Sequence, residues 1–428
     1  VMAIGIGVLG AGTVGATFIR RLVDDRDAIC AKTGLDLALV KVAVRDMAKE
    51  RPFTLEPGVL TDDPGAVIAD PGVDLVVELM GGCDPAAAHV TAALEAGKPV
   101  VTANKELIAE RGSDLIAAAE RSGVPLLFEA AVGGGIPIIR PLSETLAGEP
   151  IRRVLGIVNG TTNYILTRMT EDHQDFGSAL AEAQALGYAE PDPTADVTGA
   201  DAAAKAAILA SLAFGTWVSP DRVYREGIDG LSVADLEFAA GLGYVVKLLA
   251  VAEDTGDGVS ARVHPVMVPA AHPLAGVRGA TNAIFITGAG VDELLFAGPG
   301  AGAEPTSSAV LGDVIDAARE ILAGATVAPR IRFSPGEVLD FAAISTCWYL
   351  RLEVVDRPGV LARVATVFAD NEVSIKSVWQ EGRGDDATLL LVTHAAPESR
   401  QRDAAAALRA LDVVREIPAA IRVEDDAE

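Results

Sequence analysis

A glycine motif between an apolar strand and a helix, near the start of the chain, limits the possible folds more than any other stretch. Residues 4–9 are continuously apolar, as expected for a parallel strand that is buried on both faces. The motif Gly-Ala-Gly-Thr-Val-Gly follows at residues 10–15, and residues 16–22 then have a helical pattern. Such glycines allow a tight turn and let a pyrophosphate approach the helix N-terminus. The sequence therefore predicts a Rossmann-type domain that binds a dinucleotide at Gly10, Gly12, Thr13, Val14 and Gly15.

The end of the second predicted strand bears on the choice of cofactor. Residues 37–44 form this strand, and Arg45 and Asp46 follow it, with Lys49 and Arg51 nearby. An acid at this point usually contacts the ribose hydroxyl of NAD(H), whereas an arginine accommodates the extra phosphate of NADP(H). Because both are present, NADP(H) is favoured and NAD(H) stays possible. The alternative for Arg45 is an ordinary surface arginine.

Another strand of this domain ends in polar residues. Residues 73–80 predict a strand, residues 89–97 a helix, and residues 99–105 a short strand that ends in Asn104 and Lys105. In an open α/β sheet, ligands bind beyond the C-terminal ends of the strands. We therefore expect Asn104 and Lys105 at the functional edge of the sheet.

A second passage from strand to glycine turn lies at residues 126–137. It contains Glu129 and three consecutive glycines ahead of Pro137. The carboxylate and the exposed backbone carbonyls are hard oxygen ligands that suit a small cation. From the residues alone, a tight turn is the favoured interpretation.

The stretch from Gly187 to Lys205 carries the main indication of catalysis. Two prolines keep its first part extended, and an Ala-rich composition then predicts a helix. On that helix Asp201 lies one turn before Lys205, and the apolar residues 208, 209 and 212 place Lys205 on the apolar face. A solvated ion pair fits this spacing but not this face. We therefore interpret Lys205 as a proton donor in a cleft.

Length, charge and cysteine usage restrict the class of protein. The 428 residues are too many for one ordinary core and predict two to four domains. A formal net charge of −25 argues against nucleic acid and anionic membrane as partners. The three cysteines are far apart and the five histidines lack metal-ligand spacing, so a reduced, cytoplasmic setting is expected. No apolar stretch is long enough to span a membrane, and the N-terminal run is interpreted as a buried strand rather than a signal peptide.

The pattern changes after about residue 150. Several apolar or alternating segments suggest a mostly antiparallel sheet covered by helices, at residues 151–158, 244–253, 260–268 and 283–287. The first of these strands ends in Asn159, and the small polar residues there suit a helix cap and a substrate loop. A second glycine-rich turn, residues 296–302, precedes a predicted helix from about Thr306 to Leu322. We expect this helix to pack back onto the nucleotide domain.

Seven sequence blocks, in order along nearly the whole chain, resemble the homoserine dehydrogenase family. They are GAGTVG (residues 10–15), TANK (102–105), EAAVGGGIPII (129–139), NGTTNYIL (159–166), GYAEPDPTADVTGADAAAK (187–205), HPLAGVRGATNAI (272–284) and GPGAGAEPTSSAVLGD (298–313). The resemblance implies reversible, NAD(P)H-dependent reduction of L-aspartate 4-semialdehyde to L-homoserine, on the branch to threonine and methionine. The chain begins at the dinucleotide strand, so we expect the monofunctional form without an aspartokinase part.

The resemblance also implies roles for individual residues. Lys205 would protonate the developing alkoxide, Asp201 and Asp196 would tune and position it, and Glu190 would bind the substrate amino group. Lys105 would stabilise charge near cofactor and substrate. Further implied contacts are Asn159 and Thr161 for the substrate, and Thr102, Asn104, Lys105, Gly300 and Gly302 for the cofactor. Family members also hold a monovalent cation, typically Na⁺, which implies as ligands the Glu129 carboxylate and the carbonyls of Val132, Gly134 and Ile136.

The C-terminal part has a compact pattern of its own. After DRPGVL at residues 356–361, the predicted elements complete the order βαββαβ, which resembles an ACT domain, a ligand-sensing module. The resemblance implies threonine as a feedback effector. The contacts that can be assigned are Asp356, Pro358, Gly359 and Leu361. A purely structural or dimerising module is the alternative.

The predicted architecture is α/β with three domains. A Rossmann-type domain covers residues 1–140 and is completed by residues 303–330, and a central α+β catalytic and dimerisation domain covers residues 141–302. A linker at residues 331–347 leads to the ACT-like domain at residues 348–428. A homodimer or homotetramer is expected. The alternatives are a dehydrogenase for another small amino or hydroxy acid, and a non-catalytic sensor of nucleotide and amino acid; Lys205 with its acidic neighbours argues against both.

Overall fold

The computed structural model describes residues 3–324, 331–382 and 387–424, and it divides into two compact units. The first comprises Val1–Val154, Ala204–Pro220 and Asn282–Gly336, and the second comprises Leu155–Ala203, Asp221–Thr281 and Glu337–Glu428. The chain passes between the units within β7 (Ile151–Ile157), α9 (Ala200–Phe214) and β11 (Thr281–Gly288). The domain boundaries predicted above stay a prediction, and residues 325–330 of the predicted completing segment lie outside the described residues.

The first unit contains a six-stranded sheet in which every strand pair is parallel. Its order is β3-β2-β1-β4-β5-β6. The strands are β1 (Ala3–Leu9), β2 (Asp36–Ala43), β3 (Leu60–Thr61), β4 (Leu75–Glu78), β5 (Val100–Thr102) and β6 (Leu126–Leu127). The connecting helices are α1 (Thr13–Asp24), α2 (Arg26–Thr33), α3 (Pro64–Ile68), α4 (Ala86–Glu95) and α5 (Lys105–Ser122). The central strands are apolar, except for Glu78 at the end of β4, because parallel strands are buried on both faces.

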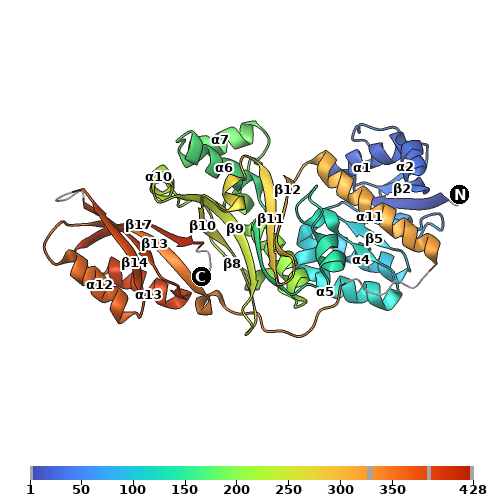
Figure 1. Ribbon diagram of the computed structural model, residues 1–428. Helices are drawn as coiled ribbons and strands as arrows, with labels where there is room; N and C mark the ends of the chain where they lie inside the picture. Colours follow the sequence, from blue (N-terminus) through green and yellow to red (C-terminus); the bar gives the residue numbers. More distant parts are fainter. Residues whose placement is uncertain (1–2, 325–330, 383–386, 425–428) are drawn as a thin grey trace. The chain divides into compact units, whose positions relative to one another are not determined.

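A helix from late in the chain completes the core of this unit. Helix α11 (Ala303–Ala323) lies beside α1 (Figure 1), and its residues Val310 and Val314 share one buried cluster with Ile4, Ile6 and Phe18. The prediction that this helix packs onto the nucleotide-binding part is confirmed. The predicted turn at residues 296–302 is wrong in its first half, because β12 (Asp292–Pro299) continues as a strand paired beside β11.

The central part of the second unit is built on a long antiparallel pair, as the sequence predicted. Strands β9 (Tyr244–Asp254) and β10 (Val259–Pro269) pair along their whole length, from Val259 opposite Asp254 to Pro269 opposite Tyr244. The short strand β8 (Tyr224–Arg225) pairs with β10 in parallel. The helices of this part are α6 (Gly160–Glu171), α7 (Phe176–Ala185), α8 (Thr194–Val197) and α10 (Val233–Gly241).

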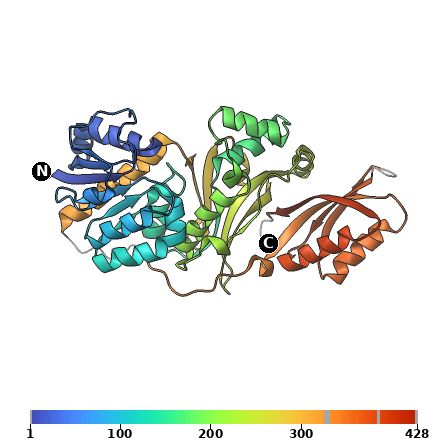
Figure 2. The ribbon, with the colours of Figure 1, turned by 180° about the vertical axis from the view of Figure 1, so that it is seen from behind.

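The C-terminal part has the predicted βαββαβ order. It consists of β13 (Ser345–Val354), α12 (Val360–Asp370), β14 (Ile375–Glu381), β15 (Ala387–Thr393), α13 (Glu398–Arg409) and β17 (Val414–Val423), with a short β16 (Ala396–Pro397). Residues 383–386, between β14 and β15, lie outside the described residues. Helices α12 and α13 cover one face of this sheet (Figure 2), and alternate residues of β13, such as Leu350 and Leu352, pack beneath them.

This C-terminal module shares a sheet with the central part of the second unit. Strand β17 pairs with β10 in parallel, with Val266 opposite Arg422 and Met267 opposite Val423, and with β13 on its other side. The strand order within the unit is therefore β9-β10-β17-β13-β15-β14. The predicted linker is also bonded to β10, because Val259 exchanges backbone hydrogen bonds with Glu337 and Leu339.

Candidate active site

The turn between β1 and α1 has the geometry that a pyrophosphate requires. Gly10 has a φ of +100°, and a Cβ on Gly15 would lie 2.4 Å from the carbonyl oxygen of Gly10. A Cβ on Gly12 would meet nothing within 4 Å, so the approach to this residue is open. Gly12 caps α1, whose first turn, beginning at Thr13 and Val14, contains no acidic residue. The positive end of the helix dipole is therefore available for a phosphate.

The ends of β4 and β5 form a connected polar group. The buried carboxylate of Glu78 accepts a hydrogen bond of 2.6 Å from Thr102 Oγ1. Thr102 Oγ1 accepts from the amide of Asn104 at 3.0 Å, and Asn104 Nδ2 donates to the carbonyl of Gly82 at 2.7 Å. Lys105, half-buried, is the first residue of α5, which Asn104 caps. Sequence reasoning missed Glu78, although an acid at the end of an apolar strand was a usable signal.

Arg45 lies in the loop that follows β2 and is exposed to solvent, as are Asp46 and Lys49. Arg51 stabilises this loop because its Nη2 donates to the backbone carbonyl of Asp46 at 2.5 Å. The loop therefore presents cationic side chains beyond the C-terminal end of β2.

The carboxylate of Glu129 is occupied by backbone donors. Its Oε1 accepts from the amides of Ile138 and Ile139 at 2.6 and 2.8 Å, and its Oε2 accepts from the amide of Arg140 at 2.8 Å. The Glu129 side chain thus links the start of the glycine loop to its end at residues 138–140. Within the described part of the chain, no hydrogen bond is accepted by three carbonyl oxygens of this loop, those of Val132, Gly134 and Ile136.

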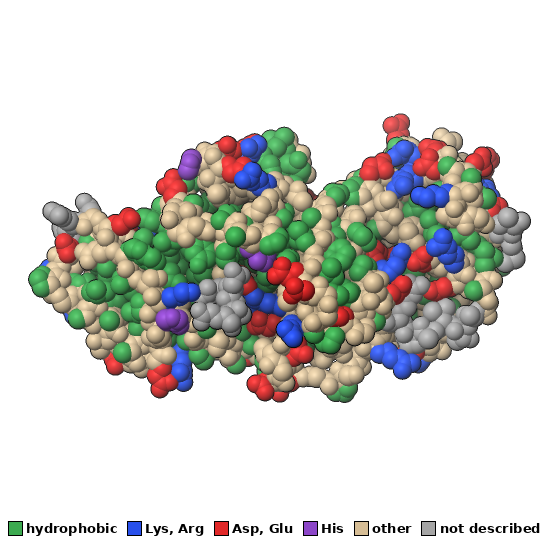
Figure 3. All heavy atoms as spheres, in the orientation of Figure 1, with side chains coloured by type: hydrophobic (Ala, Val, Ile, Leu, Met, Phe, Trp, Pro, Cys, Tyr) green, Lys and Arg blue, Asp and Glu red, His purple; other side chains and the backbone are tan. Residues whose placement is uncertain are grey.

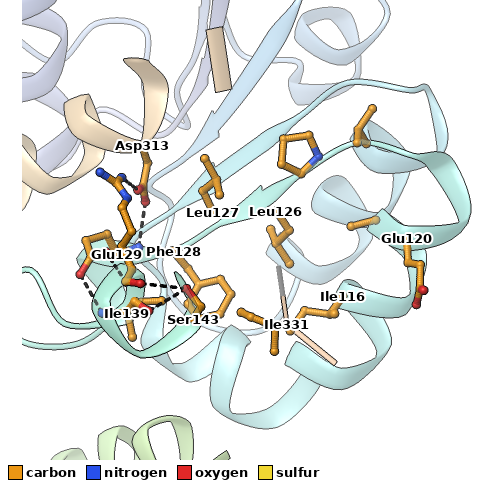
Figure 4. Close-up of a pocket in the computed structure, with 14 residues that line it drawn as sticks. Ile116, Glu120, Leu126, Leu127, Phe128, Glu129, Ile139, Ser143, Asp313 and Ile331 are labelled. Atoms are coloured by element: carbon orange, nitrogen blue, oxygen red, sulfur yellow. Dashed lines mark hydrogen bonds and ion pairs between the residues drawn. The ribbon is translucent and has the colours of Figure 1, made fainter. Parts of the chain in front are cut away.

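Asp313 ties this loop to helix α11. Its Oδ2 accepts from the amide of Glu129 at 2.8 Å and its Oδ1 accepts from Arg140 Nη2 at 3.0 Å (Figure 4). Burial raises the pKa of Asp313 to about 7, because it outweighs the lowering by the Glu129 amide and the Arg140 charge. An adjacent pocket of about 60 Å³ has walls that include Leu126 and Phe128. Among the described residues, no cluster of three or more His, Cys, Asp or Glu side chains could hold a metal ion.

The second glycine turn packs against an asparagine that sequence reasoning did not single out. A Cβ on Gly300 would lie 1.9 Å from Asn282 Nδ2, and a Cβ on Gly134 would lie 2.6 Å from the Gly300 backbone. Asn282 is 1% exposed, and its Oδ1 has no hydrogen-bond partner among the described residues. Gly302, with a φ of +122°, caps α11. This close packing explains why glycine is required at Gly300.

Asn159 gathers two carboxylates of the second unit. It caps α6 through Oδ1, and its Nδ2 donates to Asp196 Oδ1 at 2.6 Å and to Asp201 Oδ2 at 2.9 Å. Asp196 lies on α8 and Asp201 in the first turn of α9, so the amide joins two helices. The structure thus brings together three of the predicted site residues, Asn159, Asp196 and Asp201.

Lys205 is buried, with 8% of its surface exposed, one turn after Asp201 on α9. The prediction that it faces the apolar side of the helix is confirmed, since Ile208 and Leu209 are 2% and 1% exposed. Thr161 is also buried, and its Oγ1 donates to the carbonyl of Tyr188 at 2.6 Å.

Glu190 is exposed, in the loop before α8. Its backbone carbonyl accepts a hydrogen bond from Gln184 Nε2 at 3.1 Å. The exposed carboxylate of Glu190 is open to an approaching cationic group.

A buried lysine that sequence reasoning missed holds the loop before β11. Lys247 on β9 is 2% exposed and donates to Asn163 Oδ1 at 3.0 Å and to the carbonyl of Val277 at 2.5 Å. Burial lowers its pKa to about 8. Asn163 in turn donates to the carbonyls of Gly279 and Thr281, so the pair fixes the loop before β11 to α6. An isolated lysine within an apolar strand was the signal.

Comparison with known proteins decides the family. Three family models match in succession: the NAD-binding domain of homoserine dehydrogenase at residues 10–129, homoserine dehydrogenase at residues 137–315 and the ACT domain at residues 348–413. Homoserine dehydrogenase of Corynebacterium glutamicum is 46% identical over 99% of this chain and 96% of its own length. The chain belongs to the homoserine dehydrogenase family. It is accordingly an NAD(P)-dependent oxidoreductase that acts on a CH–OH group, with the predicted α/β fold and a C-terminal ACT domain.

Solved structures of homoserine dehydrogenases agree with the fold. The enzyme from Thiobacillus denitrificans is 40% identical, covers 99% of both chains and superposes with a TM-score of 0.93. A hyperthermophilic archaeal homoserine dehydrogenase mutant in complex with NADPH is 27% identical, covers 74% of this chain and 98% of its own, and superposes with a TM-score of 0.61. In this chain, no helix among the described residues is both long and apolar enough to cross a membrane.

The residues predicted to bind an effector lie at the start of α12 in the ACT domain. Gly359 caps this helix with a φ of +92° and follows Pro358. Asp356 Oδ1 accepts from Gln380 Nε2 at 3.2 Å, and the side chain of Leu361 is 45% exposed. Hydrophobic side chains gather over the strands of this domain (Figure 3). On the edge strand β14, Val378 and Trp379 are 40% and 43% exposed.

Proposed function

We propose that this chain reduces L-aspartate 4-semialdehyde reversibly to L-homoserine, with Lys205 as the proton donor. The observation that carries the proposal is the burial of Lys205, 8% exposed, on the helix that also carries Asp201. A buried ammonium group one turn from a carboxylate is suited to donate a proton to an oxygen that develops negative charge.

The cofactor, Lys205 and two aspartates have separate roles in the proposed reaction. A bound reduced nicotinamide supplies the hydride for the aldehyde carbon. Lys205 donates its proton to the aldehyde oxygen as this oxygen becomes an alkoxide. Asp201 and Asp196, which both accept a hydrogen bond from the amide group of Asn159, tune and position Lys205.

We propose that one ionic contact and two polar contacts recognise the substrate. Glu190, whose carboxylate is exposed, binds the amino group of the substrate. Asn159 and Thr161 line the substrate loop at the start of α6, and Lys105 stabilises charge near cofactor and substrate at the start of α5.

For the cofactor we propose NADP(H) in preference to NAD(H). The support is the exposed position of Arg45 and Lys49 after β2, where the ribose phosphate of NADP(H) would need a cation. Gly10, Gly12, Thr13, Val14 and Gly15 cradle the pyrophosphate, with Thr102, Asn104, Gly300 and Gly302 as further contacts.

For the cation we propose Na⁺ at the glycine loop. The carbonyl oxygens of Val132, Gly134 and Ile136 are the fitting ligands, since described residues leave them without a hydrogen bond. The Glu129 carboxylate accepts three backbone hydrogen bonds, which hold the loop, and Oε2, which accepts only one of them, completes the proposed ligand set.

We further propose threonine as a feedback effector at Asp356, Pro358, Gly359 and Leu361, and assembly as a homodimer or homotetramer. The support is the position of these residues at a helix N-terminus, where backbone amides are available for a carboxylate. Sedimentation at several protein concentrations tests the assembly, and a chain that stays monomeric would contradict it.

The test follows NADPH absorbance with aspartate semialdehyde. Replacing Lys205 by Met removes the proton donor at similar volume and should lower kcat about 10²–10⁴-fold. NADPH affinity should stay unchanged, and Lys32→Ala, a change on the exposed face of α2, should behave as the intact chain. Turnover that survives in the Lys205 variant would refute the assignment of the acid. An intact chain that binds NADPH but does not turn over would refute the substrate.

The same assay has two further arms. Replacing NADPH by NADH should raise the apparent KM for the cofactor, and equal values would contradict the preference. Replacing sodium by choline should lower the rate, and an unchanged rate would contradict the cation.

A further inference from the structure

Arg422, near the end of the chain, is buried at the junction between the ACT domain and the central part of the second unit. It lies on β17 with 4% of its surface exposed. Its Nη2 is 2.5 Å from Glu398 Oε1, at the start of α13 in the ACT domain. Its Nη1 pairs with the carboxylate of Glu226, which follows β8 in the central part. One guanidinium group therefore joins an acid of each part.

The surroundings of Arg422 restrict its orientation. Its guanidinium carbon lies 4.7 Å from the ring centroid of Trp348 and 5.6 Å from that of Tyr224. Glu398 is fully buried and also accepts hydrogen bonds from Thr346 and Trp348. Tyr224 donates to Glu226 Oε2 at 2.9 Å. Because guanidinium groups form fixed, directional pairs, this arrangement places the Glu226 carboxylate with little freedom.

The backbone next to Glu226 is packed directly against the turn between Asp196 and Asp201. The Glu226 amide donates to the carbonyl of Val263 on β10 at 2.8 Å. A Cβ on Gly227 would lie 2.1 Å from the carbonyl oxygen of Val197, and the amide of Ile228 donates to that oxygen at 2.9 Å. Val197 is the residue after Asp196. Gly199 is two residues before Asp201 and lies against Val263 and the Glu226 carbonyl.

We propose that Arg422 is a positioning residue for the active site, which acts through Glu226 to hold residues 226–228 against the turn between Asp196 and Asp201. The ACT domain then helps to hold the active-site residues in position even when no effector is bound. The inference rests on the proposed roles of Asp196, Asp201 and Lys205. It predicts that removing the contact between Glu226 and Arg422 displaces the carboxylates of Asp196 and Asp201 and leaves the glycine motif at residues 10–15 unchanged.

The first test uses Glu226→Ala in the full chain, because this change leaves the buried Arg422–Glu398 pair intact. We expect kcat to fall on the order of ten- to a hundredfold, since small displacements of catalytic groups have effects of this size. The KM for NADPH should stay within about twofold, and Glu226→Gln, which keeps a hydrogen-bond acceptor for Arg422, should recover most of the lost rate. Asp412→Ala is the matched control, because it removes an exposed ion pair with Arg363 inside the ACT domain.

A second pair of variants covers the case in which Glu226→Ala does not fold. Gly227→Ala forces a Cβ into the Val197 carbonyl, whereas Gly230→Ala in the same segment meets nothing within 4 Å. Gly227→Ala should lower kcat at unchanged KM for NADPH, and Gly230→Ala should not.

Several results would overturn the inference. They are a kcat within twofold of the intact chain for Glu226→Ala or Gly227→Ala, an equal loss in either control, or a parallel loss of NADPH affinity. If Lys205→Met keeps its turnover, the proposed acid fails independently. If Lys205→Met collapses while Glu226→Ala does not, the positioning role alone fails.

Discussion

At the scale of single residues, one amide group determines how two acids are arranged. Asn159 Nδ2 donates to both Asp196 and Asp201, at 2.6 and 2.9 Å. Two carboxylates this close repel each other when both are ionised, unless cations or donors compensate. The Asn159 donor supplies such compensation for both carboxylates.

Asp313 permits a pH prediction at the same scale. Its pKa is near 3.8 in an unfolded chain and is raised by burial to about 7 in the fold. Between these pH values the folded chain holds a proton that the unfolded chain has released, so the free energy of unfolding falls as pH rises. The contribution is complete below about pH 4 and lost above about pH 7. Asp313→Asn should remove this slope.

The measurement compares urea unfolding midpoints of the intact chain and Asp313→Asn at about pH 4.5 and about pH 8. The intact chain should lose stability relative to the variant at the higher pH. Asp114→Asn, an exposed change on α5, serves as the control and should leave the slope unaltered. If the variant and the intact chain change in stability by the same amount between the two pH values, the pKa assignment is contradicted.

At the scale of elements, the β1–α1 turn assigns different tasks to two glycines of one motif. A Cβ on Gly15 would collide with the carbonyl of Gly10, whereas a Cβ on Gly12 has open space. Gly15→Ala should therefore destabilise the fold by about 1–3 kcal/mol, the usual cost of overpacking. Gly12→Ala should fold normally but hinder the approach of the pyrophosphate.

Thermal unfolding and NADPH titration distinguish the two glycine variants. We expect a lowered midpoint for Gly15→Ala, and an unchanged midpoint with at least tenfold weaker NADPH binding, about 1.4 kcal/mol, for Gly12→Ala. Equal NADPH affinity in Gly12→Ala and the intact chain would show that the phosphate does not lie against this residue.

At the scale of the whole molecule, the C-terminal strand β17 makes the ACT domain continuous with the central sheet of the second unit. An effector that favours one conformation of this domain therefore acts on a strand that pairs with β10. Allosteric coupling is reciprocal: an effector that weakens substrate binding is itself bound more weakly when substrate is present.

Calorimetry tests this reciprocity for threonine. Threonine should bind the chain about 5–150-fold more weakly when homoserine and NADP⁺ are present, the usual range of coupling. Leu361→Glu should weaken threonine binding with and without substrate, because the change puts a negative charge beside the proposed carboxylate site. Identical threonine affinity with and without substrate would argue against feedback through this domain.

The sequence by itself determined the features that depend on neighbouring residues. Continuous apolar runs and glycine spacing defined the β1–α1 turn, helical periodicity placed Lys205 on the buried face of α9, and the element order of the ACT domain followed from short patterns. Local periodicity carries this information because the backbone repeats every 3.6 residues in a helix and every two in a strand.

Only the tertiary structure decided which distant groups meet. The Glu129 carboxylate took up backbone amides of its own loop, Asn159 joined acids from two helices, and Arg422 paired with Glu226, which lies 196 residues away along the chain. The pairing of β17 with β10 likewise joins segments that are far apart in the sequence. Such contacts depend on how whole elements pack and which polar groups are left to be satisfied, and no local pattern encodes them.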